Sequence, residues 1–208
     1  MSFITLVKKI SGLKIVEVSQ KSNPKLLAHY IERYFEIKKV RFDSQYLSQG
    51  SVFIIQNSDN QAVAGVTVIQ QGPRRVYRAI DLKVRHDLGV AEDDLGEVTG
   101  AWIDRNYFPS KIERSAVWSL LLARILSTGF HHFMFCVDGS VPGLVGIYTT
   151  GKPTSLGKID LYSQHTEAFY ASRERLVAMY ASESMRRLIK KLRPDSWISS
   201  AVTAKQKA

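Results

Sequence analysis

The sequence predicts a single α/β domain, and two observations lead to this prediction. A β-prone run at 97–104, a capped helix and an apolar run at 130–137 follow one another, which is the order of a βαβ unit with two parallel strands. The 208 residues contain no repeat, no low-complexity segment and no linker rich in Pro, Gly or Ser that would separate two domains. We therefore expect one domain that spans residues 1–208.

The first part of the chain predicts two short strands and a long helix. Residues 4–7 and 13–18 are short β-prone runs. Asn23 and Pro24, preceded by a serine, supply a cap and the first turn of a helix. The apolar residues that follow recur at helical spacing, and they are Leu27, Tyr30, Ile31, Tyr34 and Phe35. These signals predict a helix over 24–38.

The middle of the chain predicts a hairpin and a further strand. The β-rich runs 52–56 and 62–70 flank the turn-forming residues 57–60, which is the pattern of a β-hairpin. Residues 76–84 predict another strand, and the polar residues 86–94 end it.

The helix of the βαβ unit has clear boundaries. Pro109 precedes Ser110 and Glu113, which stand at the spacing of a capping box. Gly129 stands where a residue with left-handed backbone geometry usually ends a helix. The nearly uninterrupted apolar run that follows, 130–137, is typical of a central strand covered on both faces.

The last part of the chain predicts one more strand at 158–163 and a basic helical segment at 167–193. The basic face of this segment consists of Arg186, Arg187, Lys190, Lys191 and Arg193. It is either a solvated face above an apolar stripe or a docking surface for an acidic protein or an anionic membrane.

The net charge of +10 is concentrated at the two ends of the chain. Residues 1–44 and 165–208 each hold nine basic and four acidic side chains, whereas residues 45–164 hold eleven of each. Clustered cations attract anions over about 8–10 Å. We therefore expect an anionic partner such as a phosphate-bearing cofactor, an acidic protein or a membrane surface. Nucleic acid is not expected, because no known binding motif accompanies the charge.

The composition argues against several other classes of protein. A single cysteine, Cys136, rules out an internal disulfide framework and a cysteine-based zinc site, and the five histidines have no ligand spacing. No metal is expected. No apolar stretch approaches the roughly 18 residues of a membrane span, and the opening residues lack the order of a signal peptide. We expect a cytoplasmic protein.

The order of elements over residues 20–165 resembles the GNAT N-acyltransferase superfamily. The densest match is EVTGAWIDRNYFPSKIERSAVWSLL at 97–121, and it continues through FMFCVD at 133–138 and IYTTGK at 147–152. The resemblance implies a mixed sheet with flanking helices, in which strands 97–104 and 130–137 are parallel and splay apart. It also implies transfer of an acyl group from a thioester, on coenzyme A or a carrier protein, to an amine.

The loop before the helix departs from that family's pattern. The family has glycines there, whose N–H groups bind the pyrophosphate of coenzyme A, but residues 108–113 read FPSKIE. In this loss of glycines the sequence resembles the acyl-homoserine-lactone and long-chain N-acyl amino acid synthases, many of which use acyl carrier protein. The late stretch 155–170, SLGKIDLYSQHTEAFY, is also similar to that branch. Gly100 stands where the branch usually has Arg, and its acidic, Trp-containing N-terminal motif is missing.

Three residues are candidates for the chemistry and for the acceptor. Glu97 is either a general base for the amine, directly or through water, or a polar residue at the start of a strand. Tyr148 stands where the family has a Tyr near the thioester sulfur, so it either protonates the leaving thiolate or is a core aromatic. Asp138 either orients the substrate amine or caps the next segment.

Further residues are candidates for binding. The resemblance implies contacts with the donor at Ile103, Ser110, Lys111, Arg114 and Val137. Trp102 either fills the core or lines an acyl tunnel as part of the substrate site. No permanently bound cofactor is expected, and the donor substrate is acyl-CoA or acyl-phosphopantetheine.

The sequence and the resemblance are consistent with two alternative functions. The first is an N-acyltransferase that uses acyl carrier protein or acyl-CoA and a small-molecule amine, with anionic membrane as a further candidate partner. The alternative is a non-catalytic binding module with the same fold, which docks an anionic partner through its basic termini. The binding module predicts a blocked or absent opening between strands 97–104 and 130–137.

Overall fold

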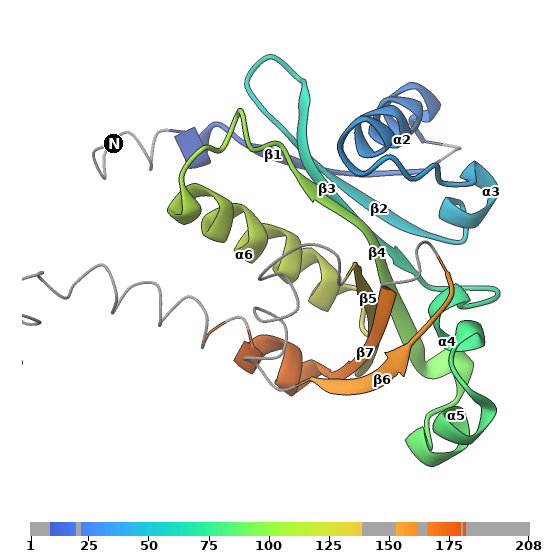
Figure 1. Cartoon of the computed structure of the whole chain (residues 1–208). Coiled ribbons are helices and arrows are strands. Elements are labelled where there is room, and N and C mark those ends of the chain that lie inside the picture. The colour runs from blue at the N-terminus through green and yellow to red at the C-terminus, as the bar shows by residue number, and fades with distance from the viewer. Residues whose placement is uncertain (1–8, 20–21, 139–152, 162–165, 180, 182–208) are drawn as a thin grey trace, which may run out of the picture.

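A computed structural model describes residues 9–19, 22–138, 153–161, 166–179 and 181 (Figure 1). These residues form a seven-stranded sheet in the order β1-β2-β3-β4-β5-β7-β6. Neighbouring strands are antiparallel except β4 and β5, which are parallel. The strands are β1 (Lys14–Val18), β2 (Gly50–Gln56), β3 (Ala62–Ile69), β4 (Leu95–Ile103), β5 (His132–Asp138), β6 (Thr154–Lys158) and β7 (Thr166–Ser172). The expected mixed sheet is confirmed.

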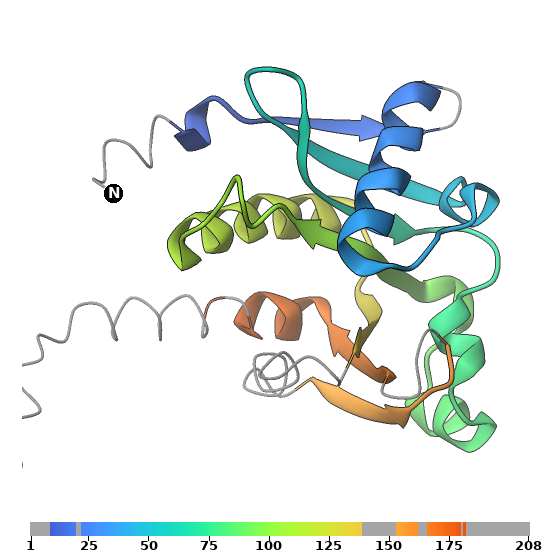
Figure 2. The ribbon, with the colours of Figure 1, turned by 45° about the horizontal axis from the view of Figure 1, so that its top comes forward.

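Helices cover both faces of this sheet (Figure 2). They are α2 (Pro24–Lys38), α3 (Ser44–Leu47), α4 (Arg75–Ala79), α5 (Leu82–Leu88) and α6 (Lys111–Ser127). Successive residues of β2 point to opposite faces, so Ile54 packs with Tyr30 of α2, and Phe53 packs with Val117 of α6. Among the described residues, none of the helices has the length and apolarity needed to cross a bilayer.

The predicted elements of the N-terminal half are largely confirmed. The side chain of Asn23 caps α2 by accepting a hydrogen bond from the Leu26 N–H at 3.0 Å. The hairpin is formed by β2 and β3, and β1 covers most of the predicted strand 13–18. The predicted strand at 4–7 lies outside the described residues.

The predicted strand at 76–84 is wrong, because this segment forms α4 and α5. Val76 and Ile80 are four residues apart and both are buried, which is the spacing of one helix face. Asp81 then caps α5 by accepting a hydrogen bond from the Lys83 N–H at 2.8 Å. The apolar pattern of this short segment fits the period of a helix as well as that of a strand, and the cap at Asp81 favours the helix.

The C-terminal predictions also need correction. The strand expected at 158–163 is wrong beyond its first residue, because β6 ends at Lys158 and residues 159–161 are not part of a strand. Residues 162 and 163 lie outside the described residues. The helical segment expected at 167–193 begins instead with β7, and only residues 173–179 and 181 of it are described as helix. Successive apolar residues of β7 face opposite sides of the sheet, since Phe169 and Ala168 belong to different core clusters. This double coverage removes the alternation that normally reveals a strand.

The two parallel strands separate partway along their length. Their register runs from Leu95 opposite His132 to Val98 opposite Phe135, and beyond these residues the strands do not pair. The antiparallel pairing of β5 with β7 continues to Asp138. We call the unpaired region between the ends of β4 and β5 the split. It confirms that the strands are parallel and splayed.

A bulge in β4 lies at the split. Gly65 pairs with Trp102 but Thr67 pairs with Thr99, so β4 has one residue more than β3 over this stretch. Gly100 takes the left-handed conformation with φ +64°, which glycine adopts without strain. Its carbonyl accepts a hydrogen bond from the hydroxyl of Tyr30 at 2.7 Å.

We expect Gly100→Ala to destabilise the protein by about 3 kcal/mol, because a Cβ atom would overlap the Tyr30 hydroxyl in addition to straining the backbone. Gly89→Ala is the matched control, since Gly89 has φ +65° with open space around it, and it should cost about 1 kcal/mol. Urea unfolding measures both. Equal losses would show that the backbone angle alone matters at Gly100.

Candidate active site

Glu97 lies on β4 where the two parallel strands begin to separate, and its side chain is fully buried. Its Oε1 accepts a hydrogen bond from the Tyr46 hydroxyl, and its Oε2 accepts one from the Val76 N–H at 2.9 Å. Burial raises the pKa of the Glu97 carboxyl to about 6, although both hydrogen bonds and the Arg74 and Arg75 guanidiniums act to lower it. A carboxylate with this pKa is mostly ionised at pH 7 and still basic enough to take a proton.

Tyr46, which donates to Glu97, is a site residue that the sequence does not reveal. It lies on α3, a helix of four residues, which is too short for periodicity to show. The only local signal is Asp43, whose side chain caps α3 by accepting from the Gln45 N–H at 2.9 Å. The Arg75 guanidinium lies 3.9 Å from the centre of the Tyr46 ring and 3.4 Å from the Asp43 carboxylate. This cation–π contact helps to hold Tyr46 in place.

Trp102 belongs to the core on the α2 side of the sheet. Its side chain is 2% exposed and packs in one apolar cluster with Leu27, Tyr30 and Phe42. Its indole N–H has no hydrogen-bond partner among the residues that the structure describes. Trp102 is therefore a buried residue of this cluster, and its part in the substrate site stays a prediction.

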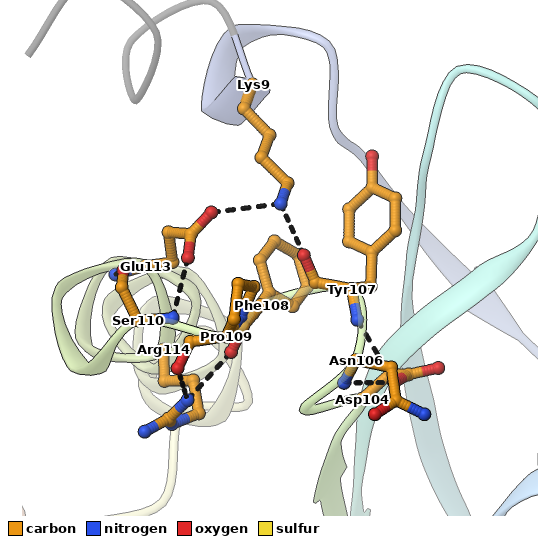
Figure 3. Close-up of polar contacts among 9 residues, drawn as sticks. All are labelled: Lys9, Asp104, Asn106, Tyr107, Phe108, Pro109, Ser110, Glu113 and Arg114. Atoms are coloured by element: carbon orange, nitrogen blue, oxygen red, sulfur yellow. Dashed lines mark hydrogen bonds and ion pairs between the residues drawn. The ribbon is translucent and has the colours of Figure 1, made fainter. Parts of the chain in front are cut away.

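The connection between β4 and α6 is held by its own side chains and by Lys9, which comes from the segment before β1 (Figure 3). The predicted capping box is confirmed, because Ser110 Oγ accepts from the Glu113 N–H at 3.1 Å and Glu113 Oε2 accepts from the Ser110 N–H at 2.8 Å. Glu113 Oε1 lies 2.9 Å from Nζ of Lys9, which also donates to the Tyr107 carbonyl. The helix start therefore carries a resident carboxylate paired with a resident cation.

The charge state of Glu113 follows from these contacts. Burial acts to raise the pKa of the Glu113 carboxyl, but the hydrogen bonds from Lys9 and Ser110 outweigh it and hold the pKa below its ordinary value. Glu113 is only 1% exposed, whereas the Lys9 side chain is 25% exposed. The carboxylate is therefore a fixed negative charge at neutral pH.

Other polar groups of the loop between β4 and α6 also form hydrogen bonds. Arg114 donates to the Phe108 carbonyl at 2.8 Å, so this donor-binding candidate ties the loop to α6. Asp104 accepts from the Asn106 N–H at 2.8 Å and from the Arg33 guanidinium at 2.7 Å. The loop is thus held by side chains from α2, from α6 and from itself.

Three charged residues lie at or near the C-terminal ends of α2, β4 and β5. Asp138 is the last residue of β5, and Arg105 follows the end of β4 closely. Burial and the positive charge of Arg105 lower the pKa of Lys38, at the end of α2, while the Asp138 carboxylate acts in the opposite direction. Lys38 therefore lies within electrostatic reach of both Arg105 and Asp138.

The donor-binding candidates lie on the two sides of the split. Ile103, Ser110, Lys111 and Arg114 gather at the connection from β4 to α6, and Val137 lies across the split on β5. Ile103 and Val137 are buried in core clusters, whereas Lys111 is exposed. Tyr148 and the basic residues 186–193 lie outside the described residues, so their placement stays a prediction. In the described part of the chain, no three potential metal-ligating side chains cluster.

Comparison with known proteins gives matches among solved structures. No protein-family model and no curated protein matches the chain. FeeM, an N-acyl amino acid synthase from uncultured soil microbes, is 14% identical with a TM-score of 0.58, over 78% of this chain and 92% of that one. The acyl-homoserine-lactone synthase LasI is 10% identical with a TM-score of 0.58, over 81% and 95%.

A third match is BjaI, a CoA-dependent acyl-homoserine-lactone synthase whose structure holds SAM and isopentyl-CoA. It is 12% identical with a TM-score of 0.57, over 83% of this chain and 90% of that one. At such identities the likeness is one of fold. The chain therefore has the GNAT-type fold found in N-acyl amino acid and acyl-homoserine-lactone synthases.

Proposed function

We propose that the protein is an N-acyltransferase that moves an acyl group from a thioester to a small-molecule amine. The observation that carries the proposal is the split in the parallel pair β4 and β5, together with the buried carboxylate of Glu97 at the point where these strands begin to separate. The shared fold with acyltransferases of known structure supports it. The fold alone does not determine the activity, so the argument rests on this site.

The donor arm is proposed to enter the split alongside β4. Beyond Val98 the backbone of β4 does not pair with β5, which leaves backbone polar groups on that side for another partner. The pantetheine arm of a thioester donor is extended and carries amides, so it can pair with this strand as an added strand would. Both acyl-CoA and acyl carrier protein present such an arm.

Glu97 is the proposed general base. It takes a proton from the amine, directly or through water, as the nitrogen attacks the thioester carbonyl. The C–N bond then forms, the C–S bond breaks, and the thiolate leaves with a proton from an acid, for which Tyr148 is the candidate. Tyr46 and the Val76 N–H hold the Glu97 carboxylate in position. Asp138 is proposed to orient the amine from the end of β5.

The remaining predictions stay part of this proposal. They are the contacts of the donor with Ile103, Ser110, Lys111, Arg114 and Val137, the docking of acyl carrier protein or anionic membrane through residues 186–193, and a cytoplasmic location. One observation favours the alternative of a non-catalytic binding module, namely the closure of the β4–α6 loop by Glu113. Consumption of a thioester separates the two functions.

Incubation with a mixture of acyl-CoAs, acyl carrier proteins and amines should yield an N-acylated product by mass spectrometry. Glu97→Gln should lower the turnover by about 10² to 10⁴, because the amide cannot take the proton. A wild type that consumes no thioester while retaining an anionic partner would identify the binding module instead.

Tyr46→Phe should move the acid limb of the pH–rate profile to higher pH. The base form of Glu97 is lost as the pH falls through about 6, and the Tyr46 hydrogen bond acts to lower that pKa. Its removal should therefore shift the limb by about one to two pH units, since a hydrogen bond to a charged group contributes about 1.5–3 kcal/mol. Tyr77→Phe is the matched control, because its hydroxyl contacts the Val90 carbonyl at 3.4 Å. Equal profiles for both variants would remove Glu97 as the titrating base.

Tyr148→Phe should lower turnover far more than it weakens donor binding. The change removes the hydroxyl that donates a proton to the leaving sulfur but keeps the ring, and general acid catalysis contributes about 10² to 10⁴ in rate. Separate measurement of kcat and of donor affinity tests this. An unchanged kcat would leave Tyr148 as an aromatic packing residue.

A further inference from the structure

We infer that Glu113, held by Lys9, prevents the proposed transferase from recognising the nucleotide half of coenzyme A. The inference rests on the proposed function, because it concerns the donor of that reaction. It makes Glu113 a specificity-determining residue. The donor would be recognised through its acyl-pantetheine part and, in a carrier protein, through the protein itself.

The first step of the argument is the position of α6. This helix follows the C-terminal end of β4 after a short loop, and the split opens toward that end of β4, so the helix begins near the open end of the split. A donor arm that leaves the split along β4 passes this point, and the diphosphate of coenzyme A lies at the far end of its pantetheine arm. The N-terminus of a helix is usually a favourable place for such an anion, since its first N–H groups lack partners within the helix.

The second step is the occupation of this helix start by the protein itself. The N–H groups of Ser110 and Glu113 are both used in the capping box. The Glu113 carboxylate, 1% exposed, already supplies the negative charge that the helix dipole favours. A diphosphate at the same place would meet a buried like charge, and it would have to break the capping box to remove it.

The third step is the partner of Glu113. Lys9 places its ammonium 2.9 Å from the carboxylate, and its second contact, with the Tyr107 carbonyl, fixes it between the loop and the helix. The cation that a phosphate could have used is therefore neutralised. Lys9 comes from a segment before β1, so the N-terminal part of the chain, and not the loop alone, holds the start of α6.

The experiment compares acyl-CoA with acyl-pantetheine carrying the same acyl chain. The ratio of their kcat/KM values should be within about threefold of one for the wild type. In Glu113→Gln the ratio should rise about tenfold, because glutamine keeps the capping-box geometry while its neutral side chain frees Lys9 for a phosphate. Urea unfolding checks that the variant is folded.

A distant variant separates the local charge from a general loss of negative charge. Glu17→Gln makes the same change in net charge at an exposed position on β1, and two strands lie between β1 and β4. Its ratio should equal that of the wild type. A rise in this ratio would overturn the assignment to the Glu113 charge.

Calorimetric titration with coenzyme A and with pantetheine gives a readout independent of turnover. The wild type should bind both with similar affinity, and Glu113→Gln should bind coenzyme A about tenfold more tightly. A wild type that prefers the coenzyme A form at least tenfold, or a folded Glu113→Gln variant with no gain, would overturn the inference. If no thioester reacts with any variant, the proposed function fails, and the titrations still decide the role of Glu113.

Discussion

The site depends on the place where pairing between β4 and β5 ends, at Val98 and Phe135. A bulge centred on Gly100 follows immediately, and a bulge bends its strand and increases its twist. Tyr30 of α2 fixes this bulge, because its hydroxyl bonds to the Gly100 carbonyl at 2.7 Å and lies 3.0 Å from the Thr67 hydroxyl of β3. One helix thereby sets the geometry of the strand that lines the split.

The charge state of Glu97 depends on its burial and on hydrogen bonds from two short helices, α3 and α4. A buried carboxylate without partners would be strongly disfavoured, and here two hydrogen bonds offset part of that cost. One comes from Tyr46 on α3 and the other from the Val76 N–H at the start of α4. Burial, together with the Glu97 and Asp138 carboxylates, raises the pKa of the Cys136 thiol to about 12, which disfavours the thiolate form that a nucleophile needs.

The parts of the structure that the sequence predicts are those with signals within a few neighbouring residues. The caps at Asn23 and Ser110 and the hairpin turn are of this kind, because their hydrogen bonds join residues three or four apart. β7 is not, since its two faces are both covered and its pattern shows no period. Glu97 is identifiable as a carboxylate in an apolar strand. Its partner Tyr46 is 51 positions away, and contacts at that distance follow only from the fold.

Two buried carboxylates of one strand–loop–helix unit, Glu97 in β4 and Glu113 in the first turn of α6, therefore have opposite character. Glu97 has neutral hydrogen-bond donors as its contacts, and burial prevails, so its pKa is raised to about 6. Glu113 has a lysine ammonium 2.9 Å away and a helix N-terminus around it, so its pKa is held below the ordinary value. Environments that separate the pKa values of like groups assign them different roles. Glu97 is suited to exchange protons near neutral pH, and Glu113 is suited to act as a permanent charge that selects what approaches the split.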